Sequence, residues 1–154
     1  MLIWAIMQVD IYLKNQVSPK GILDFEWAKN PVYARNILQK WGPQGRLYAA
    51  FSLGIDYLFL IFYSLFFILT TYKVTKTHHV FFKKSAVFVS VLFLLAGILD
   101  AFENYYLFQL LTANFHDTYV IKAYYCSVVK FLFITIGIVY LILALITKKF
   151  FSAS

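Results

Sequence analysis

Long apolar runs with very few charges dominate the pattern of hydrophobic and polar positions along this chain. Residues 47–72, 85–111 and 123–147 are each long enough to cross a bilayer as a helix, since a span needs about 20 residues. A shorter apolar run over residues 1–13 predicts the outer part of another span, either short or lacking upstream residues. The pattern predicts an all-α, polytopic transmembrane four-helix bundle, with residues 1–154 forming a single integral membrane domain.

A different periodicity appears between the first two predicted spans. Asn30-Pro31 is typical of a helix N-cap followed by proline in the first turn, and Gly42-Pro43 is typical of a helix end. We therefore expect an amphipathic helix over about residues 31–41 that lies in the membrane interface or caps the bundle. Its apolar face consists of Ala34, Ile37, Leu38 and Trp41. Simple packing on the bundle and recognition of a partner or substrate are both open as its role.

Composition supports a membrane protein. The chain is 62% hydrophobic and only 14% charged, whereas a soluble domain has about 25% charged residues. The net charge of +7 comes mainly from residues 14–46, 73–84 and 148–149, and no nucleic-acid-binding motif accompanies them. We expect these basic residues to meet lipid head groups. The positive-inside rule places the 73–84 connection and the C-terminus in the cytoplasm, although six Lys and Arg residues in 14–46 count against this orientation.

The third predicted span carries an unusual polar motif. Asp100, Glu103 and Asn104 follow one another at i, i+3 and i+4, so they share one helix face. An ionisable group at bilayer depth costs at least ~2.5 kcal/mol, so this face should point at protein or water. Asp56 and Lys130 occupy comparable depths in two other spans, in the half of the membrane away from the 73–84 connection. We expect these five residues to form one polar cluster in that outer half.

The chemistry of this cluster leaves two interpretations open. Lys130 should pair with one acid, Asp56 or Glu103, while Asn104 satisfies another. Carboxylates then remain in excess, and at least one should bind a proton more tightly than usual, since low dielectric and like charges disfavour ionisation. Such a group is a candidate general acid/base or cation ligand. Alternatively, the cluster fastens the helices together in lipid.

Three functions follow from these interpretations. The first is a pocket that binds a small amphiphile, lipid or cation, with Glu26, Trp27, Ile37 and Trp41 as a lid. The second is an enzyme that acts on a lipid-soluble substrate through carboxyl acid/base catalysis. The third is a structural or proton-relay subunit of a membrane complex, with a homo-oligomer left open. Membrane lipids are the expected partners, and nucleic acid is not.

The sequence predicts no cofactor and no metal site. Its single cysteine, Cys126, excludes an intramolecular disulfide and a cysteine-based zinc site. His78 and His79 are adjacent, so they do not form the i, i+4 pair that binds metal on a helix. The chain also lacks the sequence motifs of nucleotide-binding loops, zinc proteases and serine hydrolases.

Three segments together resemble a family of uncharacterised bacterial four-helix membrane proteins. They are GILDFEWA at residues 21–28, LGIDYLF at 53–59 and the LDxxEN pattern at 99–104. The resemblance covers roughly residues 18–111. It implies a location in the bacterial cytoplasmic membrane and a fuller first helix than residues 1–13 provide, but it implies no activity.

Overall fold

A computed structural model of the chain describes residues 8–76, 80–112 and 115–151, and in these ranges it is all-helical. After a helical turn at residues 8–10, the elements follow in the order η1 (Ile11–Leu13), α2 (Ile22–Glu26), α3 (Pro31–Thr75), α4 (Val80–Leu111) and α5 (Asp117–Phe151). Three of them, α3, α4 and α5, are long and apolar enough to cross a membrane. This agrees with an integral membrane protein.

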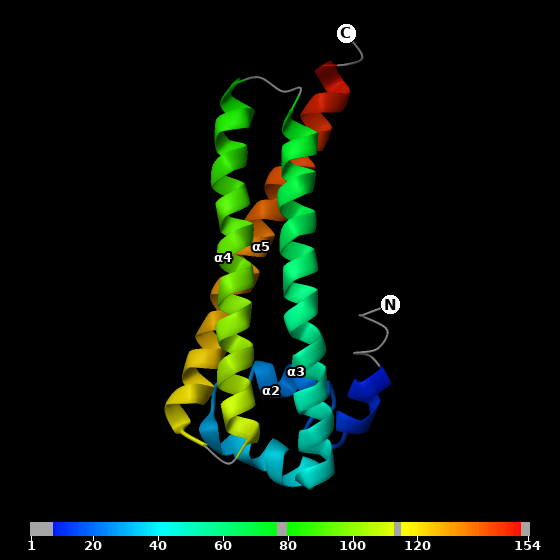
Figure 1. The fold of residues 1–154 in the computed structure, drawn as a ribbon, viewed down its shortest axis with the longest axis vertical. Coiled ribbons are helices and arrows are strands. Elements are labelled where there is room, and N and C mark those ends of the chain that lie inside the picture. Colours follow the sequence, from blue (N-terminus) through cyan, green and yellow to red (C-terminus); the bar gives the residue numbers. More distant parts are fainter. Residues whose placement is uncertain (1–7, 77–79, 113–114, 152–154) are drawn as a thin grey trace.

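The three long helices form an upright bundle in which α3 and α4 run antiparallel and α5 crosses behind them (Figure 1). Most interhelical packing joins α4 to α5 and α3 to α4, whereas α3 and α5 contact each other less. Each helix extends beyond its predicted span. Of the expected span over residues 1–13, residues 1–7 lie outside the described part of the chain, and the rest forms the short turns that end at Leu13.

The predicted stop at Gly42-Pro43 is a sharp kink inside α3. Gly42 has φ 61° and ψ −169°, a backbone conformation that interrupts the helix and that glycine tolerates without strain. Arg46 donates from Nε to the carbonyl oxygen of Leu38 at 3.2 Å, which satisfies one acceptor freed at the kink. The part of α3 before the kink runs across the end of the bundle (Figure 1).

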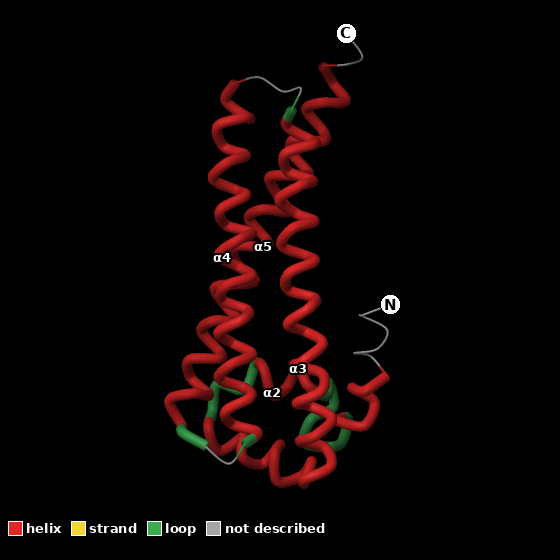
Figure 2. Tube along the Cα trace, in the orientation of Figure 1, coloured by secondary structure: helices red, strands yellow, loops and turns green. Residues whose placement is uncertain are grey.

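The loops that precede α3 and the described loop residues between α4 and α5 lie at the same end as this kink, which we call the outer end (Figure 2). Asn30 caps α3 as expected, because its side chain accepts a hydrogen bond from the amide of Val32 at 2.8 Å. The apolar face predicted for residues 31–41 is buried. It packs into a core with the outer ends of the long helices; this core includes Leu13, Phe25, Leu53, Leu107, Leu110 and Val120.

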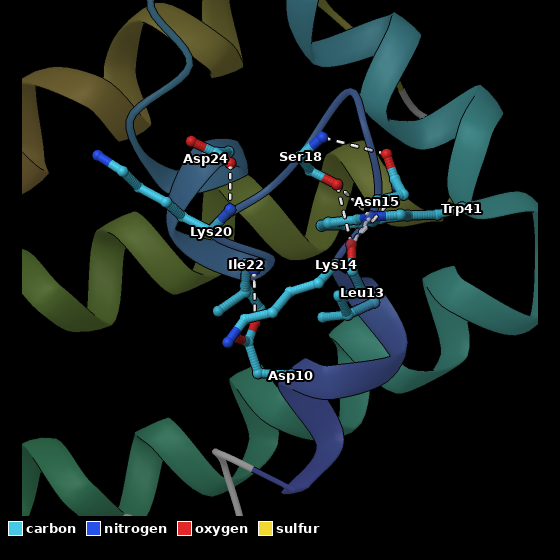
Figure 3. Close-up of polar contacts among 9 residues, drawn as sticks. All are labelled: Asp10, Leu13, Lys14, Asn15, Ser18, Lys20, Ile22, Asp24 and Trp41. Atoms are coloured by element: carbon cyan, nitrogen blue, oxygen red, sulfur yellow. Dashed lines mark hydrogen bonds and ion pairs between the residues drawn. The ribbon is translucent and has the colours of Figure 1, made fainter.

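A hydrogen-bond network ties the N-terminal segment to this core (Figure 3). The indole Nε1 of Trp41 donates to the carbonyl oxygen of Leu13 at 2.8 Å and to the hydroxyl of Ser18 at 3.0 Å. Asn15 accepts from the amides of Val17 and Ser18, closing a tight turn. Because Ser18 and Leu13 are fully buried, these bonds satisfy backbone and side-chain groups that water does not reach.

The start of α2 is fixed by a carboxylate from the preceding turn. Asp10 accepts a hydrogen bond from the amide of Ile22 at 2.7 Å and also pairs with Lys14 at 3.3 Å (Figure 3). Gly21, directly before Ile22, has φ 63°. A Cβ at Gly21 would lie 2.0 Å from the Asp10 carboxylate. Position 21 therefore needs glycine both for its backbone conformation and for the space that Asp10 occupies.

We predict that Gly21→Ala destabilises the outer end. The added methyl group displaces Asp10 and strains a left-handed backbone, which together should cost at least ~1–2 kcal/mol. Thermal unfolding in detergent should show a lowered midpoint. Gly54→Ala is the matched control, because nothing lies within 4 Å of a Cβ there and α3 is helical at that position. Equal midpoints for the two variants would contradict the prediction.

Candidate functional site

The polar residues of the three long helices meet at one level of the bundle. At ~1.5 Å per helical residue, Asp56 lies about 20 Å beyond Pro43, and Lys130 lies about 20 Å beyond Asp117. Asp100 lies about 17 Å before Leu111. Pro43, Asp117 and Leu111 all lie at the outer end, so the three polar residues lie at similar distances from it. The expected polar cluster is therefore a layer that crosses α3, α4 and α5.

An ion triad of Lys130, Asp100 and Glu103 forms the centre of this layer. The ammonium of Lys130 lies 2.6 Å from Asp100 Oδ1 and 2.6 Å from Glu103 Oε2. All three side chains are buried, with Glu103 only 1% exposed. The second oxygen of Asp100 accepts a hydrogen bond from the hydroxyl of Tyr63 at 3.0 Å. The triad therefore connects α5 to α4, and Tyr63 extends the connection to α3.

A second polar pair lies beside the triad. Asn104 donates from Nδ2 to Asp56 Oδ2 at 2.8 Å, which joins α4 to α3. Of the two acids expected to pair with Lys130, the structure brings Glu103 to it and leaves Asp56 with Asn104. Among the described residues, neither the other oxygen of Asp56 nor Glu103 Oε1 has a hydrogen-bond partner.

A cleft of about 490 Å³ opens onto this layer between α3 and α5. Asp100 of α4, Glu26 of α2 and Asp10 also line it. Most of its lining residues are apolar or aromatic: Ile22, Leu23, Leu53, Phe59, Tyr63, Phe67, Phe131 and Ile134. The cleft is therefore an apolar space with carboxyl groups at one level.

Glu26 contributes a carboxyl group from α2, outside the three long helices that carry the other acids of the layer. It has no hydrogen-bond or ion-pair partner among the described residues. Loss of hydration raises the pKa of Glu26 well above its usual range, and the nearby Glu103 carboxylate raises the pKa further. The short helix α2 thus brings one more acid to a layer that already has an excess of them.

The four residues suggested as a lid lie in different surroundings. Glu26 lines the cleft, and the ring of Trp27 lies 5.6 Å from that of Phe131, which lines it too. Ile37 and Trp41 are buried in the outer-end core and do not line the cleft.

One wall of the cleft is aromatic, and its two phenylalanines, Phe59 and Phe67, are not among the site residues predicted from the sequence. Phe59, Tyr63 and Phe67 follow Asp56 at intervals of three or four residues, so they share its face of α3. This spacing is the signal that could have found them. It is difficult to use in a span where nearly every residue is apolar.

Comparison with models of protein families, with curated proteins and with solved structures finds no significant match to this chain.

We predict that Lys130→Met strongly destabilises the bundle. The substitution leaves Asp100 and Glu103 buried without a cation, which typically costs about 3–5 kcal/mol. The thermal unfolding midpoint in detergent at neutral pH should fall accordingly. Lys122→Met is the matched control on the same helix, because Lys122 is exposed and surface charges contribute little.

A triple variant separates charge from packing. Adding Asp100→Asn and Glu103→Gln to Lys130→Met removes the uncompensated charges, so most of the lost stability should return. Failure of the triple variant to recover would show that the side-chain shapes matter more than the ion triad.

We predict that Glu26 makes stability depend on pH. Its pKa is raised in the folded state, so above the unfolded value of about 4.3 the native protein binds more protons than the unfolded chain. Stability then falls as the pH rises towards the folded-state pKa. Glu26→Gln lacks this loss, so its unfolding midpoint should exceed that of the native chain increasingly from acid to alkaline pH. Parallel curves for the two proteins would contradict the prediction.

Proposed function

We propose that this protein binds a small amphiphile with a cationic head group in the cleft between α3 and α5. The observation that carries the proposal is the excess of acidic over basic groups in the polar layer. Among the described residues, this layer has four carboxyl groups, those of Glu26, Asp56, Asp100 and Glu103, and one ammonium group, that of Lys130, which pairs with Asp100 and Glu103 only. A cationic ligand would reduce this excess, whereas an anionic ligand would add to it.

The hydrogen bonds indicate which acids are free to receive a ligand. Both oxygens of Asp100 already have partners, Lys130 and Tyr63. One carboxyl oxygen of Asp56 accepts a hydrogen bond from the neutral amide of Asn104, and the other has no partner among the described residues. The carboxyl group of Glu26 has no hydrogen-bond or ion-pair partner among them either. Both line the cleft. We therefore expect the cationic head group to contact Asp56 and Glu26.

The rest of the cleft suits an apolar tail. Phe59 and Phe67 on α3 lie across from Phe131 and Ile134 on α5, and they leave a space of about 490 Å³, within the usual size range of small-molecule sites. Aromatic faces also attract cations, so the same rings favour an ammonium over a neutral group. Phe131 is 40% exposed on the surface of the bundle. This exposure supports entry of the ligand sideways from the lipid phase.

The same proposal includes the placement of the chain in the membrane. The helix of residues 31–41 would lie in the interface at the outer end, because Arg35 and Lys40 are exposed while its apolar face is buried. The end that carries Lys73, Lys76 and Lys83 would be cytoplasmic by the positive-inside rule. The cleft would then open in the outer half of the bilayer.

We predict that dodecyltrimethylammonium raises the thermal unfolding midpoint of the protein in a non-ionic detergent, and that an uncharged dodecyl compound does not. The double variant Glu26→Gln/Asp56→Asn should bind this probe at least tenfold more weakly, because it removes both opposite charges, and one pair of unit charges about 4 Å apart is worth about 4 kcal/mol at an effective dielectric constant of about 20. Asp117→Asn is the control. The carboxylate of Asp117 is exposed, lies 2.6 Å from the guanidinium of Arg35, and does not line the cleft.

The outcomes separate the alternatives. Equal stabilisation by the charged and uncharged probes would contradict the proposal that the ligand has a cationic head group. Loss of binding in the Asp117→Asn control as well would show that the probe responds to overall charge rather than to the cleft. Circular dichroism of the double variant checks that its helices are intact.

A further inference from the structure

A second groove lies at the opposite end of the bundle, between the last turns of α3 and the first turns of α4. Its volume is about 670 Å³. The apolar side chains of Ile68, Leu69 and Val87 form its walls, and Leu69 and Val87 are 64% and 67% exposed. The groove therefore lies on the membrane-facing surface, separate from the polar cleft.

The hollow arises from a difference in side-chain size between the two helices. On α4 the groove is lined by the small residues Ala86 and Ser90, while α3 presents the large residues Ile68, Leu69 and Tyr72. Large side chains on one helix cannot fill the space that small ones leave on its neighbour unless they point inwards. Leu69 and Tyr72 instead are largely exposed, so the space between them and α4 stays open.

Two lysines line the polar end of this groove. Lys76 follows the last residue of α3, and Lys83 lies in the first turn of α4. The sequence has no Asp or Glu between Asp56 and Asp100, so no acidic residue within this stretch neutralises them. The groove thus combines an apolar body with a positively charged end.

The length of the groove along α3 is close to the thickness of the hydrocarbon region of one leaflet of a bilayer. The candidate spans end at Thr75 on α3 and begin at Phe82 on α4, so Lys76 and Lys83 lie where lipid head groups begin. From Lys76 to Ile68 the groove extends about 12 Å along α3, and half of a hydrocarbon core is about 15 Å thick. An acyl chain that runs along the groove would have its phosphate at the two lysines.

We propose that this groove binds one anionic phospholipid, with its phosphate between Lys76 and Lys83 and an acyl chain along Ile68, Leu69 and Val87. The position in the bilayer supplies the lipid, and the charge of the lysines favours a head group with net negative charge over a zwitterionic one. The site is independent of the cationic ligand proposed for the cleft, because the two spaces share no lining residue.

Lipid binding to the full chain tests this proposal. The double variant Lys76→Gln/Lys83→Gln should bind phosphatidylglycerol about tenfold to thirtyfold more weakly than the native chain, measured by native mass spectrometry or titration in detergent. Lys73→Gln/Lys84→Gln is the matched control, because it removes the same charge from the same end without touching the groove. The affinity of this control variant for phosphatidylglycerol should change less than threefold.

A third variant tests the apolar part without a change of charge. Ser90→Leu fills the inner end of the groove and should weaken phosphatidylglycerol binding while leaving all four lysines in place. Equal weakening by the two double variants would overturn the proposal in favour of general attraction to a basic surface. Equal binding of phosphatidylcholine, or displacement of the lipid by inorganic phosphate at similar concentration, would overturn it as well.

Discussion

The cost of burying charge in a medium of low dielectric governs the structure at the level of Lys130. A lone ammonium or carboxylate would be strongly destabilising there, so Lys130 must lie close to Asp100 and Glu103. These residues belong to α4 and α5, and Tyr63 brings in α3 through its hydrogen bond to Asp100. The ion triad thereby fixes how far along their axes the three helices stand relative to one another. Apolar packing alone specifies this register weakly between helices in lipid.

The outer end serves a different purpose, because it holds a short segment of chain against the bundle. Trp41 binds the carbonyl of Leu13, Asp10 caps the start of α2, and the kink at Gly42 lays the first part of α3 across the bundle end. Together they place Glu26 beside the polar layer. The outer-end core therefore determines which acid of the loop region reaches the cleft.

The two ends of the bundle differ in charge and hence in the ligands that they suit. Carboxyl groups exceed cations around the cleft, whereas the groove between α3 and α4 is lined by lysines. This distribution is the reason why we propose a cationic amphiphile for the cleft and an anionic lipid for the groove. The separation also keeps the lysines of one end from neutralising the acids of the other, since the layer and the groove lie far apart along the helices.

The sequence by itself determined the three long spans, the N-cap at Asn30 and the break at Gly42, because each depends on local features: apolar length, a capping side chain, or a residue pair that interrupts a helix. It also indicated the polar layer, since charges are rare enough in spans to be noticed. Only the tertiary structure decided that Lys130 binds both Asp100 and Glu103, that Asp56 pairs with Asn104, and that Glu26 joins them while Ile37 and Trp41 do not line the cleft. These outcomes depend on helix rotation and on the path of the chain across the outer end. Both are set by contacts between residues distant in sequence, which no local pattern encodes.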